Sequence, residues 1–314
     1  MFGAEARSIL RRNKMEKVKI FASCHNHSTF SDGEHTPERL AEIAKGEGHG
    51  GIILTDHDTV KGTYFMNKAA RKLGLRSILG CEFSTYHKGV GVHLLGFDFN
   101  PDNKKMAELL AFASSIQTDR TELLFKWGLE TGAVRGGCTW QDVRDDHPYH
   151  DYICNNEVFA SLMKRGIYEY SEYEDFFQKS FAYATCVKLG YEAKIAELLG
   201  KSYKDISTES VVKTILEAGG VPVVAHPHGL MKYADDFLSM GVMGFETRHP
   251  ELTDSEMVDF DALCTEKKLY KMGGSDHSGV LGGLLDFGEE YYCPYEKSGV
   301  TEENFMTLYE RRLG

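Results

Sequence analysis

Histidine and acidic residues recur in short groups along this sequence, and most of these groups come at the end of a run of β-forming residues. Imidazole and carboxylate side chains together are ligands that suit Zn, Mn and Fe. Their number exceeds what one ion needs, so the sequence predicts a cluster of two to three divalent metal ions. The nine candidate metal ligands are His25, His27, Asp32, His57, Glu82, His93, His226, Asp276 and His277.

Such a cluster predicts hydrolysis of a phosphate ester. Bound divalent ions lower the pKa of coordinated water towards ~7, and two ions ~3.5–4 Å apart stabilise the entering and leaving oxygens of a displacement at phosphorus. We therefore expect a hydrolase that uses metal-activated hydroxide and forms no covalent enzyme intermediate.

Seven β-forming runs alternate with helical patterns, which favours an α/β fold with a parallel sheet. In a parallel barrel the carboxyl ends of all strands meet at one face, so the candidate ligands would converge there. Thr36 is the expected N-cap of the first helix, with Pro37 at its first position. The expected strands are 18–23, 51–55, 76–80, 91–97, 221–225, 241–245 and 269–273, and the expected helices between them are 37–48, 60–73, 208–218 and 253–268.

The alternation breaks between about residues 101 and 207. Apolar residues from Met106 to Trp127 follow a helical period, and further helices are expected at 158–164, 173–181 and 192–199. We interpret this stretch as an all-α insertion. The expected organisation is an N-terminal extension at 1–16, an α/β barrel formed by 17–100 and 207–314, and a helical insertion or cap at 101–206.

The composition excludes several classes of protein. No apolar run approaches the roughly 20 residues that cross a bilayer. The net charge of −11 disfavours an extended nucleic-acid surface, which needs clustered Lys and Arg. Seven cysteines without a CxxC pair suit free thiols in a reducing cytoplasm. The expected partner is a small phosphorylated substrate, and the sequence leaves the oligomeric state open.

The sequence resembles the PHP (polymerase and histidinol phosphatase) family, whose motifs it carries in the order HxH, SDG, TDH, a strand-end Glu, AHP and GSD. Within that family it is most similar to the stand-alone phosphoesterases, through the segments SDGEHTPERL and TDHDTVKG. The resemblance implies a distorted (β/α)7 TIM-like barrel and a trinuclear metal centre. By resemblance, the catalytic centre is one ion held by His25, His27, Glu82 and Asp276, a second ion is held by the bridging Glu82 with His93 and His226, and a third by Asp32, His57 and His277.

Two positions depart from the family pattern. Asp276 and His277 are adjacent, whereas the family usually has Asp-x-His, and successive strand residues point to opposite faces. His277 can reach a metal only if the chain has already turned. Such phosphoesterases also commonly carry Gly-Arg-Pro-His in the insertion, and Ile153-Cys154-Asn155-Asn156 stands here instead. The usual arginine for the substrate phosphate is therefore missing.

Other polar residues are weaker candidates. Asp56 and Asp58 flank His57, and we expect them to hydrogen-bond behind the ligands or cap the loop. The remaining histidines, His249 among them, are expected in loops or at the surface. The candidate substrate-binding residues are Arg248, Arg135, Asn155, Asn156 and His228. The competing interpretation is a surface salt bridge for Arg248 and an ordinary polar loop position for the other four.

Two other functions compete with hydrolysis of a small ester. The same centre could serve a nuclease or 5′-exonuclease acting on nucleic acid ends, and a basic groove would favour that reading. A metal-binding regulatory or scaffold module without catalysis is the other, and the intact set of ligands argues against it.

Overall fold

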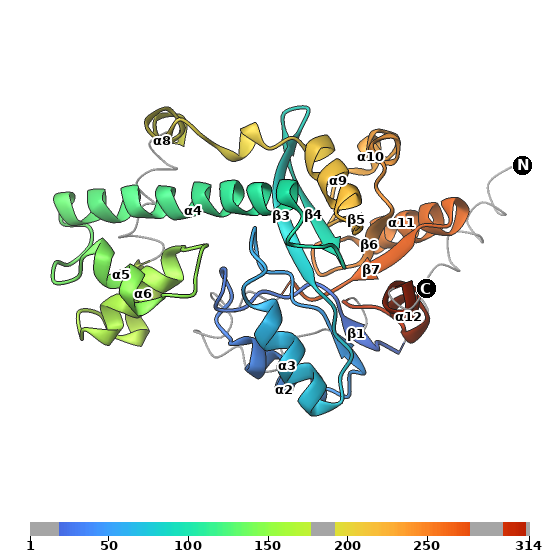
Figure 1. The fold of residues 1–314 in the computed structure, drawn as a ribbon, viewed down its shortest axis with the longest axis horizontal. Coiled ribbons are helices and arrows are strands. Elements are labelled where there is room, and N and C mark those ends of the chain that lie inside the picture. The colour runs from blue at the N-terminus through green and yellow to red at the C-terminus, as the bar shows by residue number, and fades with distance from the viewer. Residues whose placement is uncertain (1–18, 177–191, 277–297, 312–314) are drawn as a thin grey trace, which may run out of the picture.

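The computed structural model describes residues 19–176, 192–276 and 298–311. Two sheets form the centre of the fold, with helices around them (Figure 1). The small sheet is a parallel pair, β1 (Ala22–Ser23) and β2 (Gly51–Ile52). The large sheet has the order β3-β4-β5-β6-β7. Its strands are β3 (Gly80–His87), β4 (Val90–Phe97), β5 (Val221–Val224), β6 (Gly244–Arg248) and β7 (Tyr270–Gly273).

The large sheet is mixed, and the expected closed (β/α)7 barrel is not confirmed. Strand β4 runs antiparallel to both β3 and β5, and only β5, β6 and β7 are mutually parallel. The reason is local, because Lys88 and Gly89 have φ angles of 46° and 90°. Two successive left-handed residues make a tight hairpin turn, so β3 returns at once as β4 without a crossover helix.

The third strand also begins later than expected. The run at 76–80 makes only one bridge, from Arg76 to Gly51, and the strand starts at Gly80. Glu82 therefore lies inside β3 instead of following a strand. Backbone hydrogen bonds join the small sheet to the large one, among them Cys24 N to Gly273 O (3.0 Å) and Asp58 N to Glu82 O (2.8 Å). They place the ends of β1 and β2 beside β7 and β3.

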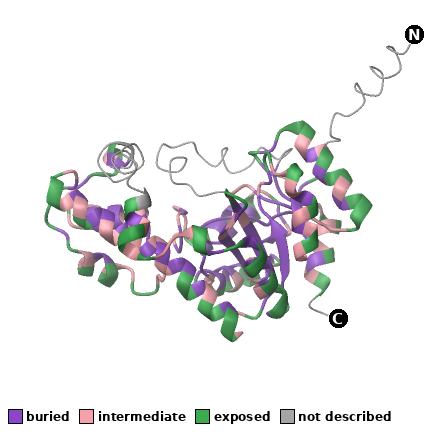
Figure 2. Cartoon of the chain, turned by 90° about the horizontal axis from the view of Figure 1, so that it is seen from above, coloured by how far each residue is buried: buried purple, intermediate pink, exposed green. Residues whose placement is uncertain are grey.

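The helices of the α/β part begin close to the expected residues. Thr36 caps the first of them by accepting a hydrogen bond from Arg39 N at 3.2 Å. Buried residues gather on the sheets and on the helix faces turned toward them (Figure 2). These helices are α2 (Pro37–Gly46), α3 (Thr63–Leu73), α9 (Thr208–Glu217), α10 (Ala234–Met240), α11 (Asp254–Lys267) and α12 (Glu302–Glu310), with single 3-10 turns at Tyr203–Asp205 and Met231–Tyr233.

In its described residues, the stretch expected to be an all-α insertion contains helices joined by turns and loops, and no strand. Helix α4 (Lys104–Thr131) is about 40 Å long by the helical rise per residue. Its first half packs against α9 through Met106 and Leu110, and its second half joins a separate core with Phe125 and Phe159. The other helices are α5 (Trp140–Asp146), α6 (Asn155–Lys164), a 3-10 turn at Tyr170–Glu172, α7 (Tyr173–Asp175) and α8 (Glu192–Leu199).

The domain boundaries at 101 and 206 stay a prediction, because α4 contributes to both cores. Among the described helices, none combines the length and the apolarity that crossing a membrane requires.

Candidate metal centre

His25 and His27 lie just past the end of β1 in a segment that Asn26 anchors. Residues two apart in extended backbone point to the same side, so both imidazoles face inward while Asn26 faces away. The Asn26 amide donates to Ile53 O at 2.8 Å, and its backbone N–H donates to the Thr55 hydroxyl at 3.1 Å. The HxH motif is therefore tied to the chain that follows β2, where His57 lies.

Glu82 stands at the centre of the histidines. Its Oε2 atom is 3.1 Å from Nε2 of His25 and 3.1 Å from Nε2 of His27. Its Oε1 atom is 3.0 Å from His93 Nδ1 and 3.0 Å from His226 Nε2. One buried carboxylate thus faces two pairs of imidazoles with its two oxygens, which is the arrangement of a bridging ligand.

Asp276 completes the group around the first histidine pair. Its Oδ1 atom is 2.9 Å from His27 Nε2 and 3.4 Å from His25 Nε2. Its φ angle of 51° lies in the left-handed region, so the chain has turned out of the β7 direction at this residue. His277 lies outside the described residues, and its role as a ligand stays a prediction.

Asp32 and His57 form the other side of the centre. Asp32 Oδ1 is 3.5 Å from His27 Nδ1, and Asp32 Oδ2 is 3.9 Å from His57 Nε2. His57 Nδ1 is also 3.4 Å from Glu82 Oε2. The structure therefore brings eight of the nine expected ligands together. Seven of them fall in overlapping groups that could each hold an ion, and His226 joins them through its contact with Glu82 Oε1.

The electrostatics of the centre follow from burying these charges together. Burial works to raise the pKa of Glu82, but His25, His57 and His93 outweigh it and hold that pKa well below its usual value. Burial lowers the pKa of His57 to about 4 despite the neighbouring carboxylates. Glu82 is therefore ionised and His57 neutral at neutral pH, which are the states in which each can bind a metal.

The donor atoms fit divalent cations. His27 Nδ1, His57 Nδ1 and Glu82 Oε2 are buried, and no group in the described part of the chain hydrogen-bonds them. Two pairs of ring nitrogens also face each other at 3.2 Å, in His25 with His27 and in His93 with His226. Once these rings have lost their protons, their converging lone pairs are what a shared cation stabilises.

Two residues of the centre escaped the sequence analysis. Glu246, in β6, accepts a hydrogen bond from His226 N at 2.7 Å, and its Oε2 lies 3.1 Å from His25 Nδ1. This first bond holds His226 at a φ of 24°, a conformation that L-residues seldom adopt. The signal was present, because Glu246 directly follows the predicted strand 241–245, as other candidate ligands follow theirs.

His249 was expected in a loop or at the surface. It does follow β6, but its side chain is 1% exposed and its Nε2 is 3.4 Å from Asp276 Oδ2. The expectation of a surface position was wrong because the rings of His25 and His226, 5.5 and 5.3 Å from its own, and Asp276 pack around it. With His25 and Glu246, His249 forms one more group of converging donor atoms.

Three of the candidate substrate-binding residues lie away from the metal ligands and make other contacts. The guanidinium of Arg135 pairs with Glu172 and lies over the Tyr168 ring, 4.2 Å from its centroid. Arg248 lines a pocket of about 490 Å³ between α11, β7 and α12, which contains none of the metal ligands. His228 is 60% exposed, and its Nδ1 lies 2.9 Å from Glu256 Oε2. The structure does not bring these three to the metal centre.

The insertion is fastened to the loop that carries Asp32. Asn156 donates its amide to Asp32 O at 2.8 Å, and Cys154 Sγ lies 3.4 Å from Ser31 O. Asn155, beside them, is half-buried. A substrate contact by either asparagine stays a prediction. The contact that the structure shows for Asn156 is its hydrogen bond to the loop that carries Asp32.

Asp56 and Asp58 hydrogen-bond behind the ligands, as expected. Asp56 accepts from the backbone and hydroxyl of Ser28, at 2.6 and 2.8 Å, and from Ser31 Oγ at 2.8 Å. Asp58 accepts from Ser84 N at 3.0 Å. These bonds fix the backbone on both sides of His57.

Residues 23–264 match the PHP domain family. The chain belongs to the PHP domain family. This PHP domain is 26% identical over 270 residues to a phosphoribosyl 1,2-cyclic phosphate 1,2-diphosphodiesterase of Eggerthella lenta, which covers 84% of this chain and 96% of the relative. It is 28% identical over 261 residues to a 5′-3′ exoribonuclease of Haemophilus influenzae, with 80% and 88% of the two chains covered.

The fold of this PHP domain also has a solved counterpart. A protein of Bifidobacterium adolescentis, described as a candidate metal-dependent phosphoesterase, superposes with a TM-score of 0.66 at 22% identity, over 92% of this chain and 96% of the other. The predicted family is confirmed. Family and site together identify a metal-dependent phosphoesterase.

Proposed function

We propose that this PHP domain hydrolyses a small phosphate ester, either a monoester or a nucleotide-type phosphate, with two to three divalent ions (Mn, Zn or Fe) as its cofactor. The observation that carries the proposal is Glu82, whose two oxygens each face a pair of imidazoles at 3.0–3.1 Å. Bound ions would activate water as the nucleophile and neutralise charge on the phosphate. The similarity to a diphosphodiesterase of a phosphoribosyl compound supports a small substrate.

The exposure of the ligands indicates where the substrate approaches. His25 and Glu82 are buried at the back of the centre, at 0% and 1% exposed. His93 is 35% exposed, Asp276 26% and Asp32 34%. The phosphate would therefore meet the centre on the side formed by these three. The insertion contacts the same side through Asn156 and Asp32, so it would limit the size of what enters.

An exonuclease acting on nucleic acid ends is the second candidate, and it is supported by the similarity to a 5′-3′ exoribonuclease. The net charge of −11 weighs against it, because binding along several phosphates requires clustered cations.

The test is a metal-loaded assay that compares phosphorylated nucleotides and metabolites with single- and double-stranded oligonucleotides. We expect a higher kcat/KM on the small esters and only a modest dependence on salt. The Glu82→Gln variant, purified in parallel, controls for contaminating phosphatases. A preference for long polynucleotides with a steep loss of affinity as salt rises would support the exonuclease instead.

A further inference from the structure

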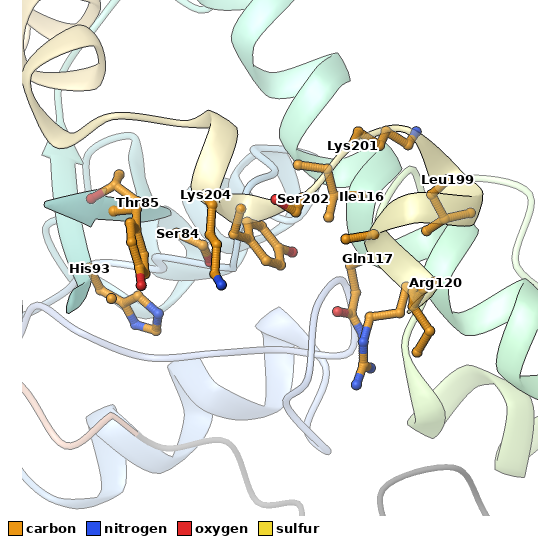
Figure 3. Close-up of a pocket in the computed structure, with 15 residues that line it drawn as sticks. Ser84, Thr85, His93, Ile116, Gln117, Arg120, Leu199, Lys201, Ser202 and Lys204 are labelled. Atoms are coloured by element: carbon orange, nitrogen blue, oxygen red, sulfur yellow. The ribbon is translucent and has the colours of Figure 1, made fainter. Parts of the chain in front are cut away.

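A second part of the site lies beside His93. A cavity of about 490 Å³ opens between β3, β4, α4, α8 and the 3-10 turn that precedes α9. Figure 3 shows the His93 imidazole on one side of it and Gln117 and Arg120 on the other, with Lys204 reaching in between. Since His93 is also one of the candidate metal ligands, the cavity adjoins the metal centre.

The charge of the cavity is opposite to that of the whole chain. Its described lining includes Arg120, Lys201 and Lys204 but no Asp or Glu. The net charge of the chain is −11. Cations gathered in a lining without a carboxylate favour an anionic ligand, and Lys201 contributes least to this field because Asp119 pairs with it.

The two lysines of the lining differ in their contacts. The Lys201 ammonium is 2.5 Å from Asp119 Oδ2 and donates to Ser115 Oγ at 2.7 Å, so its charge is largely compensated. Lys204 is exposed, with its ammonium 5.8 Å from the centroid of the Tyr86 ring.

Arg120 follows Ile116 by four positions and Gln117 by three on α4, so the three share one helix face toward the cavity. The apolar part of the lining is formed by Ile116 with Ile195 and Leu199 from α8. This part of the cavity suits the organic portion of a ligand.

We infer that Arg120, assisted by Lys204, binds a second anionic group of the substrate while the ester phosphate lies at the metal centre beyond His93. The inference rests on the proposed function and names its substrate class, a small phosphate ester with a further phosphate or carboxylate. A guanidinium suits this role because it binds such groups through two parallel hydrogen bonds. Arg120 would supply the cation that the segment 153–156 lacks.

A binding measurement tests the inference without turnover. Adenosine 3′,5′-bisphosphate is titrated calorimetrically into chelator-treated protein. Arg120→Gln should weaken its binding about 10- to 100-fold, the worth of charged hydrogen bonds. Lys126→Gln, which removes a positive charge from the same helix where Lys126 pairs with Glu122, should leave it unchanged. Arg120→Lys should restore part of the affinity. Equal binding by the wild type, Arg120→Gln and Lys126→Gln, or no binding by the wild type, would overturn the inference.

Turnover by the Mn-loaded enzyme adds a second readout. Arg120→Gln should raise KM for the bisphosphate about 10- to 100-fold with little change in kcat, since the group does not touch the reacting atoms. Its kcat/KM on p-nitrophenyl phosphate, which has no second anionic group, should stay within about threefold of wild type. Equal losses on both substrates would count against the inference. If the wild type cleaves neither substrate while the difference in binding persists, the proposed function fails and the anion site stands.

Discussion

At the scale of single residues, the centre depends on a carboxylate that is costly to bury. Glu82 is 1% exposed, and the imidazoles of five histidines lie within 3.4 Å of its oxygens. An ionised carboxylate in such a place persists only when paired, because an isolated buried charge is strongly destabilising. Burial lowers the pKa of His25 and His27, but their carboxylate neighbours outweigh it and raise that pKa well above its usual value, so these two imidazoles carry protons when no cation is present. Metal binding would therefore release protons.

Glu82→Gln should remove more function than any other single change at the centre. An amide can offer one neutral oxygen where the carboxylate offers two charged ones, so it cannot bridge two ions. We expect fewer bound ions per chain by elemental analysis and a loss of kcat/KM of about 100-fold or more. Glu303→Gln on the exposed face of α12 is the matched control. Unchanged metal content in the Glu82 variant would refute the bridging assignment.

Glu246→Gln tests a residue that positions two of the expected ligands. The carboxylate lies 3.1 Å from His25 Nδ1 and accepts the His226 N–H, so it orients two imidazoles at once. Loss of such an orienting partner typically costs about 10- to 100-fold in metal affinity or activity. Competition titration with a fluorescent chelator would measure the change. Metal affinity equal to that of the wild type would show that the orientation of His25 and His226 does not depend on Glu246.

At the scale of elements, the start of α11 fixes the loop after β5. Glu256 is the third residue of a capping box with Thr253, and it also accepts the Gly229 N–H at 2.8 Å. Against the effect of burial, these hydrogen bonds, together with His228, lower the pKa of Glu256 to about 2. His228 thus helps to join this loop to α11 through its contact with Glu256.

Glu256→Ala should destabilise the fold by about 1–2 kcal/mol at neutral pH, since it removes a cap and leaves two backbone donors unpaired. The folded pKa is lower than the unfolded one, so the stabilisation is present above the unfolded pKa and lost as pH falls toward about 2. Urea unfolding of wild type and variant between pH 3 and 7 should show the difference shrinking on the acid side. Glu266→Ala, an exposed change on the same helix, is the control. A difference independent of pH would exclude the ionised carboxylate as its source.

At the scale of the whole molecule, the metal centre is where separate parts of the chain meet. Its residues come from the segments after β1 and β2, from β3, β4 and β6, and from the segments after β5 and β7. Ions bound there would add further links between the small sheet and the large one, beside the hydrogen bonds that already join them. Occupancy should therefore govern global stability.

Protein purified without chelator should contain two to three divalent ions per chain and melt at a higher temperature than chelator-treated protein. Ligand binding to the native state adds about 2.7 kcal/mol per site at a free concentration 100 times Kd. Calorimetry at increasing Mn or Zn concentration should show a rising Tm, and elemental analysis should give the stoichiometry. One ion or fewer after reconstitution, with no shift in Tm, would contradict the cluster.

The chemistry could be predicted from the sequence alone, because metal ligation needs particular side chains and their types can be read directly. The spacing of HxH and the strand-end position of His226 are local features, and so are the helices, since capping by Thr36 and apolar periods act over a few residues.

Other features could be seen only in the folded chain, because they depend on contacts between residues that are distant in the sequence. The hairpin turn at Lys88 and Gly89 reversed one strand, so the large sheet is mixed and not parallel. His249 became part of the centre through contacts with His25, His226 and Asp276, which lie far from it in the sequence. The cations of the cavity beside His93 come from two segments, around residues 120 and 204, that no spacing in the sequence connects. Chain reversal and long-range packing bring such residues together, and neither is encoded by any one segment.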